Sequence, residues 1–468
     1  MRQTFIRAGM VFSLLLATAW LHAQTLLQAE PPQPIQQNAE QGTLTAADAV
    51  AIALRQNPDL QAAQAGAAQA RTGTAQAESA FLPQITFTEN ATVGDDPVYA
   101  FGTRLRQGRF TTEDFALNAL NSPGAVGNFM SRADGQWNVF DSFGSVARLH
   151  QARSMVAAAQ KAITEADQDL ILQVLNAYYG WLLAKKQSDV AQQAAATAQA
   201  LVQSSEARVA AGTAVDADAL AAHVNLEMRQ QEMIRAQSEV QIARAQMETA
   251  LGVQLTPGQQ PAETLAEQTL PADGLEQDEV RAVQQRANLQ AAAAQLDAQR
   301  SGLHSARSAF GPHLNLYGSY EADNPNLTQG GSTNWMTGAE LRVDIFSRSQ
   351  YAALANAKAR LSQAQAQMQS VQNGVRLQVR RAYYEQDAAR QMLDVARAAI
   401  AQSQESLRIT HDRYDAGLTT MTDLLRAEDA ARSSQTEYWQ SVYNEILSHA
   451  ALLRAMGDLS PQSSVVTQ

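Results

Sequence analysis

Two opposite charges lie near the carboxyl end of the chain, at Asp423 and Arg426. Side chains three positions apart share one face of a helix, so this carboxylate and this guanidinium can meet there. The same aspartate also ends the run Thr420-Met-Thr-Asp423, which is typical of the first turn of a capped helix. An exposed ion pair and a helix cap are both compatible with these residues.

The remaining candidate residues do not indicate catalysis or a metal site. The seven histidines lack the spacing of metal ligands, and His304 and His313 lie on either side of a turn at Pro312. The chain has no cysteine, which removes disulfides, a thiolate nucleophile and a cysteine zinc site. No Ser/His/Asp set, phosphate-binding loop or paired-carboxylate cleft is recognisable. We therefore predict a protein that is not an enzyme, with no cofactor and no metal.

The chain contains an internal repeat. Matching residues recur 205 positions later, and the pairs include Tyr178/Tyr383, Arg208/Arg413, Gly212/Gly417, Asp218/Asp423 and Gly252/Gly457. Farther upstream the offset is 229, as between Pro83 and Pro312, so the first half holds 24 extra residues before about residue 147. A long period used twice indicates a duplicated structural unit. We predict repeats over 44–256 and 275–459, joined by a proline-containing linker over 257–274.

The start of the chain is typical of an export signal. Two arginines precede a short apolar run from Met10 to Leu21, and Ala23 follows it. We predict a signal peptide over 1–23, an extended proline-containing linker over 24–43 and a C-terminal tail over 460–468. The net charge of −11 argues against nucleic acid as a partner.

Helical patterns fill most of each half. From about Val146 to Val209 there is no proline, and at 1.5 Å per residue such a helix is about 95 Å long. Gly212 follows where a helix of this kind would end, and a shorter helix begins near Val215. The second half repeats the series, with a long helix from about Tyr351 and a shorter one that ends near Met456. Helices of this length span distance and exceed what a globular domain needs.

Between each proline and each long helix, apolar and polar residues alternate. Ile85 and Phe87 follow the first proline in this pattern, and Trp335, Leu341 and Val343 precede the second long helix. Strands of about ten residues with one apolar face match those of a transmembrane barrel, and a soluble sandwich is the alternative. We predict β-hairpins at about 84–140 and 313–345, which gives four strands per chain.

Four strands cannot close a barrel, because bacterial barrels begin at about eight strands and an open sheet in lipid leaves its edges unpaired. A dimer would give eight strands with a filled interior, and a trimer would give twelve with room for a lumen. The first hairpin carries a long loop, from 94 to about 132. This loop is either a solvated segment tied down by its own aromatic residues or a lid over the exit.

The order of these features resembles the TolC family of outer-membrane efflux proteins over nearly all of the mature chain. The matching residues are Leu82-Pro83 and Gly311-Pro312, Trp137-Asn-Val-Phe-Asp141, and the turns Arg208-Val-Ala-Ala-Gly212-Thr213 and Arg413-Tyr-Asp-Ala-Gly417-Leu418. The resemblance implies a mainly α fold with a membrane β-barrel. Three copies would form a twelve-stranded barrel in the outer membrane, and duplicated long helical hairpins would form a tunnel across the periplasm.

The resemblance also implies a function. Such a homotrimer is the exit duct of a tripartite efflux or type I secretion system, surrounded by outer-membrane lipid and joined through a periplasmic adaptor to an inner-membrane pump. The cargo, whether small molecules or proteins, does not follow from the sequence. The alternative is a periplasmic coiled-coil scaffold without channel activity, which would explain the helices and leave the alternating strands without a role.

Particular residues take roles from the resemblance. Pro83 and Pro312 would mark the passage from helix to barrel. Tyr414 and Asp423 match the family's gate tyrosine and outer gate aspartate, and three copies of the aspartate around an axis would select cations. Thr419 stands where the family has an arginine that ties the gate, and Arg426 replaces the family's inner gate aspartate. This gate would therefore be less acidic, held by contacts between Asp423 and Arg426, or more easily opened. The residues at the tips, where the adaptor would dock, are Arg208, Gly212, Thr213, Arg413, Gly417 and Leu418.

Overall fold

A computed structural model describes residues 42–268 and 274–467 of the protein. The predicted signal peptide, most of the linker over 24–43, the linker residues 269–273 and the last residue of the tail lie outside the described residues. The chain divides into two units, of which Leu44–Pro257 with Pro261–Gln468 is the larger and contains the described helices and the main sheet.

The elements of the larger unit follow the duplicated order. The long helices are α6 (Gly144–Ala210) and α10 (Arg348–Asp415), and each is followed by a shorter one, α7 (Asp216–Leu251) and α11 (Met421–Met456). Further helices are α2 (Ala46–Gln56), α3 (Pro58–Ser79), α4 (Pro97–Arg106), a 3-10 helix (Thr112–Phe115), α5 (Leu117–Asn121), α8 (Leu275–Gln285), α9 (Ala287–Ser308) and α12 (Ser464–Thr467). The strands are β2 (Gln84–Gly94), β3 (Val126–Phe140), β5 (His313–Asn324) and β6 (Ser332–Arg342), with the short β1 (Thr43–Leu44) and β4 (Gln260–Pro261).

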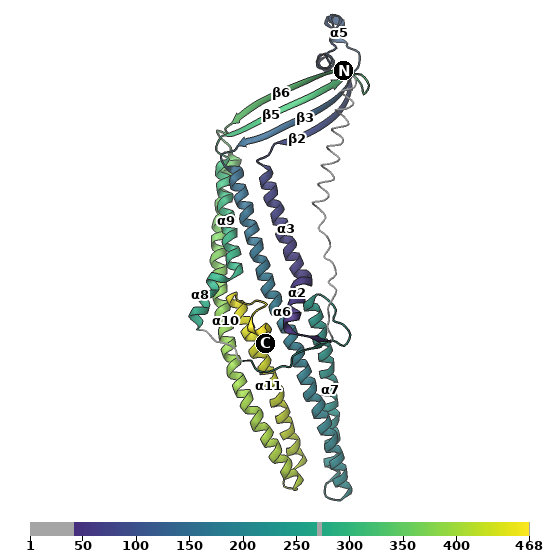
Figure 1. Ribbon diagram of the computed structural model, residues 1–468, viewed down its shortest axis with the longest axis vertical. Coiled ribbons are helices and arrows are strands. Elements are labelled where there is room, and N and C mark those ends of the chain that lie inside the picture. Colours follow the sequence, from purple (N-terminus) through teal and green to yellow (C-terminus); the bar gives the residue numbers. More distant parts are fainter. Residues whose placement is uncertain (1–41, 269–273, 468) are drawn as a thin grey trace. The chain divides into compact units, whose positions relative to one another are not determined.

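The helices pack side by side along their lengths (Figure 1). At the end next to the sheet the neighbours are α3 on α6, α6 on α9, and α9 on α10. At the other end α6 packs on α7 and on α11, and α10 packs on α11. With 67 and 68 residues, α6 and α10 are each about 100 Å long at 1.5 Å per residue. None of the helices in the described part of the chain has an apolar stretch that could span a bilayer.

In both halves the helical segment before the sheet is interrupted, and the residue at the interruption bonds the end of a neighbouring helix. Between α2 and α3, Asn57 donates from Nδ2 to the carbonyl of Ala250 at 3.0 Å. Between α8 and α9, the guanidinium of Arg286 donates to the carbonyls of Arg454 and Ala455 at 3.1 and 3.2 Å. Carbonyls in the last turn of a helix lack partners within that helix, so each side chain satisfies the helix that packs beside it. Asn57 is followed by a proline, whereas Arg286 carries no local signal that a helix ends there.

The main sheet is antiparallel with the order β2-β3-β5-β6. Its register aligns Phe87, Ala133, Tyr320 and Trp335 across the four strands, so these side chains share one face. That face is apolar and open to its surroundings, as the 75% exposure of Trp335 illustrates. The opposite face carries polar residues such as Asp134 and Ser319. The sheet is open, and β2 and β6 have no strand partner on their outer sides among the described residues.

The long loop of the first hairpin is held in two ways. Phe110 packs edge-to-face on both Phe101 and Phe115, with ring centroids 4.8 and 5.0 Å apart. Gln107 also binds the sheet, donating from Nε2 to the carbonyl of Gly127 at 2.8 Å and to Asn128 Oδ1 at 3.0 Å. The aromatic contacts expected for a self-supported loop are therefore present, and a second set of contacts ties the loop to β3.

Two buried titratable groups lie on α11, on the side that packs against α10. Glu445 is 4% exposed, and its Oε2 has no hydrogen-bond partner among the described residues. One turn later His449 is also buried, and its Nδ1 lies 2.8 Å from Nε2 of Gln386. Burial raises the pKa of Glu445 to about 7 and lowers the pKa of His449.

We predict that Glu445 makes the fold less stable as pH rises. Its carboxyl group binds a proton more tightly in the folded chain than in the unfolded chain, so stability falls between the unfolded pKa and about 7. Glu445→Gln removes this loss. At pH 8 it should raise the free energy of unfolding by about 3 kcal/mol, and with it the melting temperature, whereas little should change at pH 4. Thermal unfolding followed by circular dichroism measures this. Exposed Glu437→Gln is the control, and an equal gain in both variants would contradict the prediction.

Candidate functional site: the helix tips

The first tip is a turn between α6 and α7 built on a left-handed glycine. Gly212 has φ +73° and donates its N–H to the carbonyl of Val209 at 2.9 Å. The next N–H, of Thr213, reaches the carbonyl of Arg208 at 2.9 Å. These two bonds satisfy carbonyls that the helix end leaves free, and a residue with a Cβ would be strained at this φ.

The second tip repeats this turn between α10 and α11. Gly417 has φ +72° and donates to the carbonyl of Tyr414 at 3.0 Å, and Leu418 donates to the carbonyl of Arg413 at 2.8 Å. The side chain of Leu418 is exposed at the end of the turn. The structure therefore places the residues named for both tips at two chemically equivalent turns.

One side chain joins the two tips. Arg208 donates to the carbonyls of Tyr414 and Asp415, both at 3.3 Å, and to the Asp415 carboxylate at 3.1 Å. Its guanidinium carbon also lies 4.8 Å from the centroid of the Tyr414 ring. A cation over an aromatic face contributes about 0.5–2 kcal/mol. A residue expected to dock an adaptor and a residue expected to gate the tunnel are thus in direct contact.

Tyr414 lies inside the chain. Its side chain is 7% exposed and packs in a cluster with Leu201, Leu226 and Leu424, which come from α6, α7 and α11. Burial raises the pKa of Tyr414, so the phenol stays protonated at neutral pH. In a single chain, Tyr414 therefore acts at the tips by holding the two helical hairpins together.

Asp423 combines the two arrangements that its sequence position allows. Its Oδ2 accepts from the hydroxyls of Thr420 at 2.7 Å and Thr419 at 3.2 Å, and its own N–H donates to Thr420 Oγ1 at 3.2 Å, which completes a capping box. The hydrogen bond from Thr420 is the main cause that lowers the pKa of Asp423. The Nη1 of Arg426 lies 3.8 Å from Oδ1, and both side chains are exposed. The carboxylate is therefore charged, capped and open to solvent.

A second link between the hairpins was not found from the sequence. It is a charge quartet made of Arg229 and Glu232 on α7 with Asp429 and Arg432 on α11. Arg229 is 5% exposed and bonds Glu232 at 2.7 Å and Asp429 at 3.0 Å. Arg432 lies 3.5 Å from Glu232 and 3.6 Å from Asp429. The available signal was an acid and a base three residues apart on each of the two helices.

Glu428 lies next to the quartet on α11, and its pKa is shifted by the packing there. Burial is the main cause that raises the pKa of Glu428, and the neighbouring charge of Asp429 adds to it. A cavity of about 220 Å³ adjoins these side chains between the two hairpins, with Asn225 on its wall. Buried charges of this kind need their partners, because an unpaired one costs far more than an exposed one.

The two prolines lie at the passage from helix to sheet. Pro83 precedes β2 and Pro312 precedes β5. Two hydrogen bonds brace this junction: Trp137 donates from Nε1 to the carbonyl of Phe81 at 3.0 Å, and Ser142 donates to the carbonyl of Pro312 at 2.8 Å. The first bond ties β3 to the end of α3, and the second ties the start of α6 to the residue before β5.

The contact of Arg208 predicts an asymmetry between the duplicated tips. Arg208→Ala should loosen the second tip, because it removes a cation over Tyr414 and three hydrogen bonds. Amide hydrogen exchange over residues 410–418 should accelerate roughly five- to thirtyfold, which corresponds to about 1–2 kcal/mol. Arg413 is the duplicated counterpart and makes no such bridge to any described residue, so Arg413→Ala is the matched control. Equal acceleration in both variants would mean that Arg208 does not join the tips.

Comparison with known proteins agrees with this architecture. The family model of the outer membrane efflux protein matches residues 49–253 and 280–458. The outer membrane protein TolC of Vibrio cholerae is 31% identical over 29% of this chain and 31% of its own length. The outer membrane protein OprJ of Pseudomonas aeruginosa is 28% identical over 63% of this chain and 62% of its own length. In both, the match spans less than two thirds of the relative.

Solved structures share the fold over a larger part of the chain. The CmeC outer membrane channel of Campylobacter jejuni superposes with a TM-score of 0.74, at 17% identity, over 90% of this chain and 88% of its own. The MtrE outer membrane channel of Neisseria gonorrhoeae gives 0.73, at 19% identity, over 88% of both chains. The chain therefore belongs to the outer membrane efflux protein family and is a protein of the outer membrane.

Proposed function

We propose that three copies of this chain form the exit duct of a tripartite efflux or type I secretion system. The observation that carries the proposal is the open sheet. Its apolar face is exposed, and its two edge strands, β2 and β6, present backbone groups without a partner strand in the described chain. In lipid such edges must be paired, and pairing β6 of one copy with β2 of the next closes the sheet into a barrel.

The helices support the same assembly. β2 follows α3 and β6 precedes α10, so the helices beside the two free strands are also outermost in the row α3, α6, α9, α10. Nearer the tips the outermost helices are α7 and α10. Both helices carry exposed apolar side chains at helical spacing, namely Leu220, Val224 and Met228 beside the tip of α7 and Leu377, Tyr384 and Met392 near the middle of α10. Head-to-tail contacts between such edges close into a ring.

Three copies suit a duct better than two. Eight strands leave an interior that side chains fill, whereas twelve leave room for a lumen. The polar face of the sheet would line that lumen, with Arg132, Asp134 and Gln136 along β3. The first two of these form an ion pair at 2.8 Å.

The tips support docking of a periplasmic adaptor and, through it, an inner-membrane pump. Arg208 is engaged by Tyr414, which leaves Thr213, Arg413 and Leu418 as the outward side chains of the two turns. Gly212 and Gly417 would contribute the shape of these turns. Asp423 of the three copies would form the carboxylate ring of the gate, with Arg426 beside it.

The assembly can be tested directly. The mature protein should resist extraction of membranes with urea, migrate as a heat-sensitive trimer and conduct ions in planar bilayers. A scaffold without channel activity would be extracted and would conduct nothing. A monomer that stays soluble without detergent in analytical ultracentrifugation would rule the duct out.

The gate residues should set ion selectivity. Asp423→Ala should reduce the cation preference of single channels, and Arg426→Ala should raise it and lengthen the open time. Because exposed pairs contribute about 0–1 kcal/mol, neither change should unfold the trimer. Asp423→Asn separates charge from capping, since the amide oxygen can still accept from Thr420. If the Asn variant keeps the selectivity of the unchanged protein, Asp423 is only a helix cap.

The charge quartet should hold the duct closed. Asp429→Asn removes a partner of buried Arg229 and weakens the link between α7 and α11 by about 1–3 kcal/mol, so the channel should stay open longer. Single-channel recording measures the ratio of open to closed time, which should rise on the order of tenfold. The control is Asp412→Asn, because Asp412 pairs with Arg408 within α10 at 2.9 Å. Identical gating of both variants would contradict a latch.

A further inference from the structure

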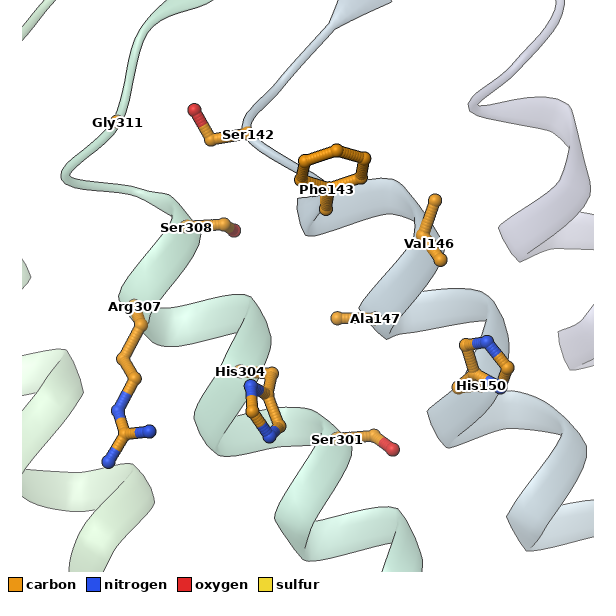
Figure 2. A pocket seen from close by; sticks show the side chains of 10 residues that line it. All are labelled: Ser142, Phe143, Val146, Ala147, His150, Ser301, His304, Arg307, Ser308 and Gly311. Atoms are coloured by element: carbon orange, nitrogen blue, oxygen red, sulfur yellow. The ribbon is translucent and has the colours of Figure 1, made fainter.

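A cavity lies at the junction between helix and sheet, between the start of α6 and the end of α9 (Figure 2). Its volume is about 530 Å³, within the range of about 300–1,000 Å³ typical of small-molecule sites. The side chains that matter for its chemistry are Phe143, Val146 and His150 from α6 and its cap, and Ser301, His304 and Arg307 from α9. None of them has a role in the barrel, the tips or the gate.

The polar wall of the cavity has unused hydrogen-bonding capacity. Among the described residues, no hydrogen bond engages the side chains of His150, Ser301 or His304. Figure 2 shows Ser301 and His304 between the two helices, with His150 on the opposite wall. Arg307 borders the cavity from the last turn of α9, and in Figure 2 its guanidinium points away from Ser301 and His150. Imidazole, hydroxyl and guanidinium groups together are donors that suit a phosphate.

The other wall is apolar and continuous with the apolar face of the sheet. Phe143 is 69% exposed and packs edge-to-face on Phe140, with ring centroids 5.6 Å apart. Phe140 pairs with Leu314 in the register of β3 and β5, so it belongs to the face that would contact lipid. The cavity therefore opens on the lipid side of the wall and not into the lumen.

Phe143 is held beside the cavity by a backbone conformation that is energetically unfavourable. Ser142 and Phe143 are consecutive non-glycine residues with φ of 55° and 66°. Residues in this left-handed region cost about 1–3 kcal/mol each and persist where the surrounding structure holds them. The hydrogen bond from Ser142 to the carbonyl of Pro312 is one such restraint.

The charge around the cavity differs from that of the whole chain. The ten residues of α3, α6, α9 and α10 nearest the sheet contain six basic residues and one acidic residue, in a chain of net charge −11. The basic residues are Arg71, Arg148, Arg153, Arg300, Arg307 and Arg348, and the acidic one is Glu78. Arg148, Arg153 and Arg300 form ion pairs with Asp141, Glu78 and Asp297, which leaves Arg71, Arg307 and Arg348 without an ion pair among the described residues. Basic clusters beside a membrane-embedded segment attract anionic lipid headgroups.

We propose that this cavity binds the phosphate of an anionic phospholipid from the periplasmic leaflet, with phosphatidylglycerol as the representative. His150, Ser301 and His304 hold the phosphate, and the Arg307 side chain turns in from the last turn of α9 to join them. The acyl chains run along Phe143 and Val146 onto the apolar face of the sheet. The inference rests on the proposed function, because it needs the sheet to lie in the bilayer. It names a lipid class and a site that the duct alone does not require.

The test uses the full mature chain in detergent and titrates dioctanoyl phosphatidylglycerol by calorimetry. His304→Ala/Arg307→Ala should weaken its binding about tenfold or more, because two phosphate donors are lost. The control Lys161→Ala/Lys358→Ala removes two exposed basic residues that lie about 15 Å or more along α6 and α10 from the sheet, and it should bind as the unchanged protein does. Phe143→Ala should also weaken binding of the lipid.

Two further probes identify the source of the phosphate. Dioctanoyl glycerol supplies the chains without the phosphate, and inorganic phosphate supplies the anion without the chains, so each should bind at least tenfold more weakly than the lipid. Inorganic phosphate that binds as tightly as the lipid would overturn the proposal, as would equal lipid binding by the two double variants. Trimer stability and conductance of the same variants are recorded separately. A conducting trimer with no preference for the lipid refutes this inference and leaves the duct standing.

Discussion

Unpaired backbone at two edges is the constraint on which the rest of this structure depends. The sheet of β2, β3, β5 and β6 has one apolar face that is exposed and two outer strands without partners in the described chain. In a bilayer, the backbone N–H and C=O groups of these edge strands have no water with which to form hydrogen bonds, so an open sheet is unfavourable there. In the proposed duct, association of copies edge to edge would remove this cost, and α7 and α10 also expose apolar side chains on the two outer sides of the helical row. Sheet and helices would therefore favour the same arrangement of copies.

The two duplicated halves share the same elements and contacts in most places, and they differ most at the tips. Asn57 and Arg286 are counterparts that break the short helices and satisfy the carbonyls of the returning helix in the same way. The glycine turns are likewise equivalent, with φ of +73° and +72°. By contrast, Arg208 bridges to the other half and Arg413 does not, and Thr420 caps α11 where Val215 stands before α7. Two halves that were identical at the tips could not move differently, so these asymmetries are where a gate can arise.

Two sets of charged side chains lie near the tips, and they differ in how far their arginines are buried. Asp423 and Arg426 are exposed and 3.8 Å apart, so solvent screens them and their contact adds little to stability. In the charge quartet, Arg229 is buried and depends on Glu232 and Asp429 for compensation, although Asp429 itself is exposed. Loss of a partner therefore costs more at Arg229 than at Arg426. The burial of the two cations, and not that of the carboxylates, distinguishes the two sets.

The sequence by itself determined what depends on neighbouring residues. The ends of α6 and α10, the turns at Gly212 and Gly417 and the capping box at Asp423 follow from local backbone preferences, so they could be predicted. Only the tertiary structure decided the break at Arg286, the burial of Tyr414 under Arg208, the quartet between α7 and α11, and the cavity between His150 and His304. Each of these joins residues more than 90 positions apart, or depends on a partner helix that local sequence does not specify. The physical reason is that burial and long-range contacts are properties of packing, and packing is fixed only when the two halves lie side by side.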